Sequence, residues 1–248
     1  MVKSKIENLR TPGLIKEMWN PGLPDNDLLN QLREIHEYQV YKPKKEKNNI
    51  IVDAGANIGM ASLYLEEFAQ KVYSLEPNPQ IYEALVKNTE GHDKIMPLNY
   101  GIFNATGTYK FFAPEDEIPQ SVVPSSEKEV TKQINVQLKS IDEFMAENGI
   151  EEIDCLKLDV ESSEYMILMS EGFDKVNKQI SCVVGEGHFA PRGIGFPQML
   201  EFIFKSYGFK YKILKTPMPN ISQNIEYKHE GFYKKVTGEF HTNFIAWR

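Results

Sequence analysis

The sequence feature that most constrains the fold is a short apolar run that ends in a glycine-rich turn. Residues 50–59 read IIVDAGANIG, and a segment with helical spacing follows directly. Glycine lets the backbone turn sharply and approach a ligand closely, because no Cβ stands in the way. A strand, a glycine turn and a helix N-terminus together are typical of nucleotide-binding α/β sheets. We therefore expect Gly55 and Gly59 to shape a ligand-binding loop at one edge of a sheet.

Beyond this turn, strand-like and helix-like segments alternate along the chain. We expect core strands over residues 49–55, 71–78, 94–103, 154–161 and 180–189, and two closing strands over 211–216 and 241–248. This alternation predicts right-handed crossovers and a mostly parallel sheet. Two more β-like segments, residues 108–115 and 134–140, predict an inserted β-arm. The predicted fold class is α/β, with a Rossmann-like, doubly wound, seven-stranded sheet.

The first 47 residues differ from the rest of the chain. They hold turn-rich stretches and then an amphipathic segment from Asp27 to about Tyr38, where leucine and isoleucine recur at helical spacing. We expect residues 1–47 to form a helical extension that covers the core or helps to close the site. Residues 48–248 are expected to form the Rossmann-like domain.

Charge and hydropathy exclude several classes of partner. The formal net charge is −7, whereas a general nucleic-acid binder usually carries a broad basic face. Apolar runs are too short to cross a bilayer, and the first residues lack the apolar core of a signal peptide. We expect a cytoplasmic protein whose partner is a small molecule rather than nucleic acid or membrane. The oligomeric state is left open.

Acidic residues at the ends of two strands narrow the choice of cofactor. Asp53 precedes the glycine turn, and Glu76 ends the next strand about twenty residues later, where a carboxylate suits a ribose diol. A dinucleotide site usually has the spacing G-x-G-x-x-G, but Gly55 and Gly59 are spaced G-x-x-x-G. A carboxylate beside the loop repels a pyrophosphate but can hydrogen-bond an ammonium group. The pattern favours S-adenosylmethionine over a nicotinamide dinucleotide.

A second group of polar residues follows the later strands. Asp159 and Glu161 end the fourth core strand, and their spacing of two places both side chains on one face. Glu186 and His188 lie at the end of the fifth, where an imidazole that titrates near neutrality is a candidate general base. The carboxylates have three candidate roles: taking a proton from an acceptor hydroxyl, binding the acceptor, or holding a divalent metal. No complete ligand set for a metal can be named, so metal dependence is left open.

Three blocks of the sequence resemble the FkbM-type methyltransferases, a branch of the class I S-adenosylmethionine-dependent enzymes. The blocks are residues 52–65, 72–85 and 156–168, and the similarity extends from about Ile50 to His188. The resemblance implies methyl transfer, most often to oxygen on a small-molecule or sugar-like acceptor. The residues themselves do not distinguish oxygen from nitrogen.

The resemblance also assigns cofactor contacts. It implies that the methionyl part lies against the loop, the ribose against the end of the second strand, and the adenine beside residues after the third strand. These positions are Asp53, Gly55, Ala56, Asn57 and Gly59 for the loop, Glu76 and Pro77 for the ribose side, and Asn99, Tyr100 and Gly101 for the adenine side.

The third block departs from the family pattern at one position. The family typically reads K-x-D-x-E-G-x-E, and this chain has Ser162 in place of the glycine. Ser162 or the following Ser163 is a candidate cap for the next helix. A serine at this position also changes the size or polarity expected of the acceptor pocket, so the sequence specifies the acceptor less well than it specifies the fold.

Two rival functions belong to other classes. A nicotinamide-dependent oxidoreductase predicts a G-x-G-x-x-G loop, which this sequence lacks. A protein that binds the cofactor without catalysis is supported only by Ser162. Acceptor specificity is expected to lie in the N-terminal extension and in the loop from Glu115 to Glu129, and Arg192 is a further candidate for contacting an anionic acceptor.

Overall fold

A seven-stranded, mostly parallel sheet forms the centre of the protein. The computed structural model describes residues 18–23, 25–113, 118, 120–122, 131–189, 196–214 and 240–248. The strand order is β3-β2-β1-β7-β8-β10-β9. The strands are β1 (Asn48–Ala54), β2 (Ala69–Leu75), β3 (Ile95–Leu98), β7 (Cys155–Leu158), β8 (Cys182–Phe189), β9 (Lys210–Leu214) and β10 (Phe240–Trp247). Only β10 runs antiparallel to its neighbours, so the predicted fold class is confirmed.

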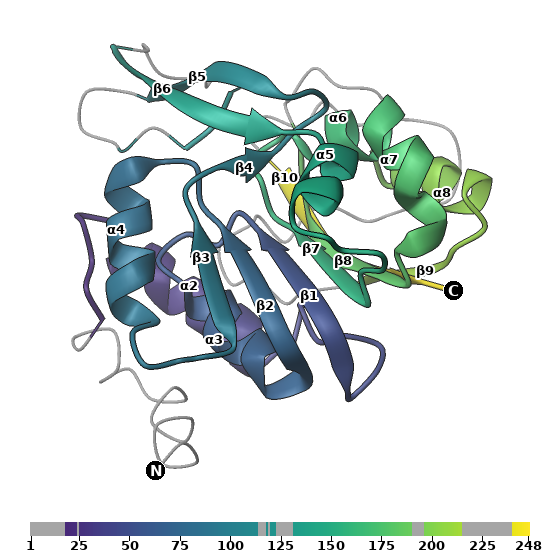
Figure 1. Cartoon of the computed structure of the whole chain (residues 1–248), viewed down its shortest axis with the longest axis horizontal. Coiled ribbons are helices and arrows are strands. Elements are labelled where there is room, and N and C mark those ends of the chain that lie inside the picture. Colours follow the sequence, from purple (N-terminus) through teal and green to yellow (C-terminus); the bar gives the residue numbers. More distant parts are fainter. Residues whose placement is uncertain are drawn as a thin grey trace, which may run out of the picture.

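Helices cover both faces of this sheet (Figure 1). On one face lie α2 (Asp25–His36), α3 (Met60–Leu65) and α4 (Pro79–Asn88), and on the other α5 (Ile141–Glu147), α6 (Glu164–Leu168), α7 (Glu171–Val176) and α8 (Phe196–Ser206). The short 3-10 helices η2 (Glu66–Phe68) and η3 (Asn177–Gln179) follow α3 and α7. A hydrophobic core lies on each face of the sheet, and consecutive residues of β1 contribute to opposite cores. Ile51 packs with the first group of helices and Val52 with the second. Burial on both faces explains why the central strands are apolar throughout.

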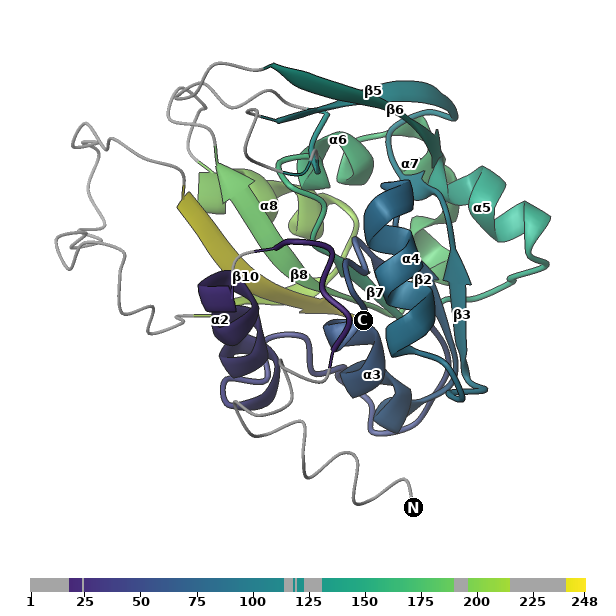
Figure 2. The same cartoon turned by 90° about the vertical axis from the view of Figure 1, so that its left-hand side faces the viewer.

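The predicted β-arm is present as a separate three-stranded sheet. Its order is β4-β6-β5, and its strands are β4 (Gly101–Ile102), β5 (Gly107–Ala113) and β6 (Lys132–Lys139). Figure 2 shows this small sheet above the edge at which the parallel strands end. The expected continuous strand over residues 94–103 is wrong, because the chain leaves the main sheet after Leu98 and β4 pairs with β6 instead.

The serines at two helix starts behave differently. Ser140 stands at the N-cap of α5, but its side chain makes no capping hydrogen bond. Two helices follow β7, because Ser170 caps a second start by accepting from the Phe173 N–H. The amphipathic segment predicted from Asp27 to about Tyr38 is confirmed as α2.

The strand order determines where on the sheet a ligand site can form. The chain runs from β1 outward to β2 and β3 and then returns to the other side of β1 as β7. Such a reversal opens a crevice at the carboxyl ends of the two central strands, where open α/β sheets bind ligands. In register, Ala54 at the end of β1 lies beside Leu75 of β2 and Leu158 of β7. Among the described residues, no helix is long and apolar enough to span a bilayer.

Candidate functional site

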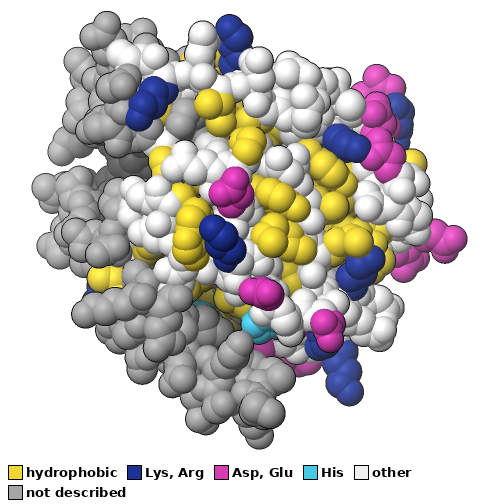
Figure 3. Space-filling model, turned by 60° about the vertical axis from the view of Figure 1, so that its left-hand side comes forward, with side chains coloured by type: hydrophobic (Ala, Val, Ile, Leu, Met, Phe, Trp, Pro, Cys, Tyr) yellow, Lys and Arg dark blue, Asp and Glu magenta, His cyan; other side chains and the backbone are white. Residues whose placement is uncertain are grey.

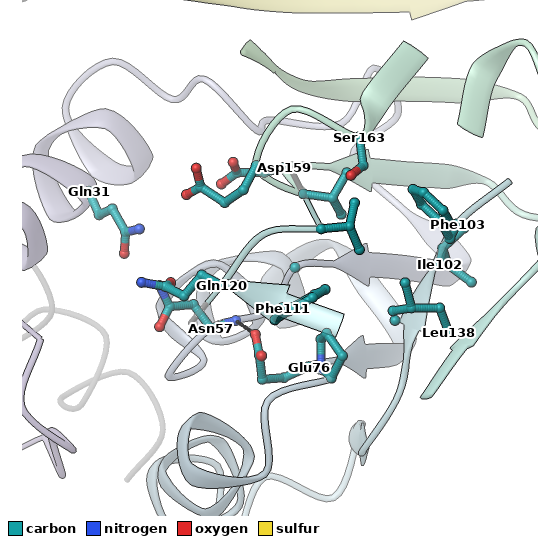
Figure 4. Close-up of a pocket in the computed structure, with 16 residues that line it drawn as sticks. Gln31, Asn57, Glu76, Ile102, Phe103, Phe111, Gln120, Leu138, Asp159 and Ser163 are labelled. Atoms are coloured by element: carbon teal, nitrogen blue, oxygen red, sulfur yellow. Dashed lines mark hydrogen bonds between the residues drawn. The ribbon is translucent and has the colours of Figure 1, made fainter. Parts of the chain in front are cut away.

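A pocket lies at this crevice, between the ends of β1, β2 and β7 and the small sheet (Figure 4). It encloses about 590 Å³, counting the part that opens to solvent. Its lining residues are Gln31, Gly55, Asn57, Glu76, Pro77, Gly101, Ile102, Phe103, Phe111, Gln120, Val122, Leu138, Asp159, Val160, Glu161 and Ser163. Seven of the residues expected to contact the cofactor or the acceptor from the glycine turn and the strand ends are therefore in one cavity: Gly55, Asn57, Glu76, Pro77, Gly101, Asp159 and Glu161.

The glycine turn passes directly against the end of β7. Gly55 has φ +81°, and a Cβ there would lie 1.8 Å from the carbonyl oxygen of Asp159. Gly59 has φ +97°, and a Cβ there would lie 2.9 Å from a side-chain atom of Leu85. Both positions require glycine on conformational and steric grounds. Gly59 does not line the pocket and instead allows the turn to enter α3.

Glu76 is held inside the pocket wall by backbone donors. Its Oε1 accepts from the Asn78 N–H at 2.8 Å and its Oε2 from the Asn57 N–H at 3.1 Å. Burial raises the pKa of this carboxyl from 4.5 to about 7, although those two hydrogen bonds act in the opposite direction. Each oxygen retains a lone pair, so two hydroxyl donors of a ligand can still be accepted.

Asp53 lies beneath the loop rather than in the pocket. It is fully buried, its Oδ2 accepts from the Ser62 hydroxyl at 2.6 Å, and its Oδ1 is 2.9 Å from the Lys157 ammonium. Lys157 also donates to the Gly55 carbonyl at 2.6 Å and is itself buried. This geometry makes Asp53 a support for the loop. Lys157 was not singled out from the sequence, although a lysine inside an apolar strand is costly unless it is paired.

The residues expected beside adenine divide into two groups. Gly101 and Pro77 line the pocket, whereas Asn99 donates to the Glu76 carbonyl at 2.9 Å and so ties the segment between β3 and β4 to the turn after β2. Tyr100 packs against Phe144 of α5 and does not line the pocket. Ala56 is buried within the loop. The apolar wall comes mainly from residues that sequence reasoning missed, namely Ile102, Phe103, Phe111 and Leu138.

His188 lies within a group of carboxylates beside the pocket, and two of these, Asp159 and Glu161, line it. Its Nε2 is 3.8 Å from Oδ1 of Asp159 and 3.8 Å from Oε2 of Glu161, and its Nδ1 is 3.1 Å from Oε1 of the buried Glu164. Burial lowers the pKa of His188, but these carboxylates outweigh it and hold the pKa well above its ordinary value. The ring is therefore protonated at neutral pH. The fold therefore brings His188, Asp159 and Glu161 together from the ends of two neighbouring strands.

Three further acidic or phenolic groups surround this cluster. Tyr41 donates to Oδ2 of Asp159 at 2.8 Å. Burial raises the pKa of Glu34 to about 7, and the nearby Asp159 charge adds to the effect. Burial likewise raises the pKa of Glu186 well above its usual range, again with a contribution from Asp159. Sequence reasoning missed Glu34 and Tyr41, because both come from the N-terminal segment and meet β7 only through the fold.

The turn after β7 has a left-handed backbone at two residues. Glu161 has φ +50° and Ser162 has φ +74°. Ser162 occupies the position at which FkbM-type sequences typically have glycine, and the conformation explains that preference. The expected capping role is not seen, because Ser163 is the N-cap of α6 and its side chain makes no capping hydrogen bond. Instead Glu164 accepts from the Val160 N–H at 2.9 Å.

Some residues expected to determine specificity lie outside the described part of the chain. These are Arg192 and, within the loop from Glu115 to Glu129, all residues except 118 and 120–122. Of the described loop residues, Gln120 and Val122 line the pocket.

Comparison with known proteins identifies the family of this site. The sequence profile described as "Methyltransferase FkbM domain" matches residues 53–211. Methyltransferase sdnD of Sordaria araneosa is 29% identical over 195 residues, which cover 65% of this chain and 74% of that protein.

Similar solved structures are more distant. They include precorrin-6y C5,15-methyltransferase from Geobacter metallireducens GS-15, with 12% identity, a TM-score of 0.45 and coverage of 87% of this chain and 89% of that one. An rRNA methylase from Streptococcus thermophilus has 11% identity and a TM-score of 0.46, covering 87% and 96%.

Proposed function

We propose that this chain, which belongs to the FkbM methyltransferase domain family, uses S-adenosylmethionine to methylate an oxygen atom of a small-molecule or sugar-like acceptor. The observation that carries the proposal is one continuous pocket with two chemically different ends. One end has the glycine turn and the buried Glu76, and the other has the carboxylates around His188. A nucleoside-binding end joined to a proton-accepting end is what methyl transfer to a hydroxyl requires.

The residues of the first end fit the cofactor. Because residue 55 is glycine, the turn can pass against the backbone of Asp159, with which any Cβ would collide. Glu76 presents two buried oxygens to a diol. The apolar wall of Phe103 and Phe111 suits a flat base. Gln31 and Asn57 offer polar groups at the opposite side of the cavity, as Figure 4 shows. Below the loop, Lys157 holds the Gly55 carbonyl in place, and Asp53 pairs with the Lys157 ammonium.

The second end of the pocket binds and deprotonates the acceptor in this proposal. S-adenosylmethionine, when bound, supplies a methyl group that is already activated on a sulfonium. The chain therefore has to orient the acceptor oxygen in line with that methyl group and accept its proton. We assign these tasks to His188 with Asp159, Glu161 and Glu186. Because its raised pKa keeps His188 protonated at neutral pH, Asp159 and Glu161 are the groups that accept the proton, and the imidazolium balances their charge. Glu186, whose own pKa is raised by burial, orients the acceptor instead.

The charge of the site favours a small acceptor over nucleic acid. Asp159 and Glu161 line the acceptor end, and Glu186, His188 and the buried Lys157 lie beside them. Carboxylates in this density repel a phosphate backbone. Lys and Arg side chains on the described part of the face in Figure 3 are scattered and form no continuous basic surface. The cytoplasmic location and the division of the chain after residue 47 stay predictions.

A turnover assay separates this enzyme from a protein that only binds the cofactor. The protein is incubated with S-adenosylmethionine and a panel of hydroxylated small molecules, and S-adenosylhomocysteine release is measured for wild type and Asp159→Asn. We expect acceptor-dependent release that Asp159→Asn reduces at least 100-fold, while S-adenosylmethionine still binds. Equal release by both proteins would contradict the assigned role of Asp159.

A further inference from the structure

The group around His188 has the geometry of a cation site. Asp159 and Glu161 follow β7, and His188 lies near the end of the neighbouring β8. One ligand atom from each of the three lies within 4.8 Å of the others. The 3.8 Å separations of Nε2 from the two carboxylate oxygens are too long for direct hydrogen bonds. They suit atoms that share one ion, since two ligands each about 2.1 Å from a divalent metal lie up to about 4.2 Å apart.

Neighbouring groups orient each ligand toward this point. Tyr41 donates to Oδ2 of Asp159, and the other oxygen, Oδ1, is the one closer to His188. Glu164 is fully buried and pairs with Nδ1 of His188, and Nε2 is the nitrogen that faces Asp159 and Glu161. A carboxylate on the far nitrogen is the usual means by which proteins fix a metal-binding imidazole.

A buried carboxylate oxygen provides an independent indication of a bound cation. Glu34 of α2 is only 5% exposed, and its Oε1 has no hydrogen-bond partner among the described residues. Its strongest charged neighbours are Asp159 and His188, so it belongs to the same group. Burying an unpaired carboxylate oxygen is costly unless a ligand meets it. The buried Glu186 adds another acidic group beside the same residues.

We propose that Asp159, Glu161 and His188 bind a divalent cation that holds the acceptor oxygen at this end of the pocket. The inference rests on the proposed function, within which the cation balances the charge of the carboxylates around it. Two carboxylate oxygens and one imidazole nitrogen favour Mn²⁺ over the all-oxygen coordination preferred by Ca²⁺. Glu161 is half-exposed, so an acceptor can reach the remaining coordination positions from the pocket.

The test is a titration of the full chain, freed of metal by chelation, with Mn²⁺ followed by electron paramagnetic resonance. Glu161→Gln removes a half-exposed ligand with little risk to folding, and His188→Gln removes the nitrogen ligand. Glu83→Gln, an exposed residue of α4, is the matched control. We expect one saturable site per chain in wild type and in the control, and at least a tenfold weaker affinity in both site variants. Weak binding that is equal in all four proteins would overturn the proposal.

Calorimetric titration of the same metal-free samples with S-adenosylmethionine keeps the two hypotheses apart. Saturable cofactor binding without a specific Mn²⁺ site would contradict only the cation proposal. Failure of the wild-type protein to bind the cofactor, with or without Mn²⁺, would contradict the proposed function. Thermal unfolding of each variant shows whether a lost Mn²⁺ site reflects a lost fold. Weakened Mn²⁺ binding in Glu161→Gln with a wild-type unfolding midpoint supports the assignment.

Discussion

The buried carboxyl of Glu76 makes protein stability depend on pH in a way that one substitution removes. Burial raises its pKa from 4.5 to about 7. The folded protein therefore holds this proton more tightly than the unfolded chain does. A raised pKa contributes stability that is fully present below pH 4.5 and is lost as the pH rises through 7. Glu76→Gln has no such proton to lose.

The magnitude follows from the two pKa values. With 4.5 in the unfolded chain and about 7 in the folded protein, ionisation of Glu76 costs about 1 kcal/mol at pH 5 and about 3 kcal/mol at pH 8. Glu76→Gln has its own constant penalty, because an amide cannot accept both backbone hydrogen bonds. That penalty does not change with pH. The stability of wild type relative to the variant should thus fall by about 2.5 kcal/mol between pH 5 and pH 8.

Urea unfolding of both proteins across this range measures the difference directly. Other titrating groups, including His188, are present in both proteins and cancel. Glu151→Gln, an exposed carboxylate outside the site, is the control, and we expect its profile to remain parallel to that of wild type. If the curves of wild type and Glu76→Gln also run parallel within about 0.5 kcal/mol, Glu76 does not have the raised pKa on which the reasoning depends.

Three further substitutions test the loop and the turn. Ser162→Gly should raise the free energy of unfolding by about 1 kcal/mol, because Ser162 has φ +74°; an unchanged or lower thermal midpoint would contradict this. Gly55→Ala should abolish S-adenosylmethionine binding, since its Cβ would lie 1.8 Å from a backbone oxygen; wild-type affinity by calorimetry would show that the loop is not closely packed. Lys157→Met should cost about 3 to 5 kcal/mol by leaving Asp53 buried without its ion-pair partner, and an unfolding free energy within 1 kcal/mol of wild type would refute the pairing.

Much of the site was predictable because parallel topology brings strand ends together. Glu76, Asp159 and His188 are far apart in sequence, yet each lies at or just beyond the carboxyl end of a strand, and these ends share one edge of the sheet. Apolar strands, a glycine turn and polar strand ends are all local signals. For the same reason the seven-stranded sheet and the helical segment α2 could be inferred without a structure.

What was not predictable depends on contacts between distant segments. Tyr41 meets Asp159 across 118 residues, and no local pattern marks it as part of the site. Asp53 was expected to face the ligand, but only the folded strands show that Lys157 lies beside it. The departure of the chain from the main sheet after Leu98 also escaped prediction, because residues 94–103 have a strand-like composition throughout.

Calorimetric titration with S-adenosylmethionine, S-adenosylhomocysteine and NAD tests the central claim most directly, with Glu76→Ala as the comparison. The account predicts saturable binding of both sulfur ligands to wild type, affinity at least tenfold weaker in Glu76→Ala, and no binding of NAD. Binding of NAD alone would contradict it, and the glycine turn would then have to be interpreted as a dinucleotide site.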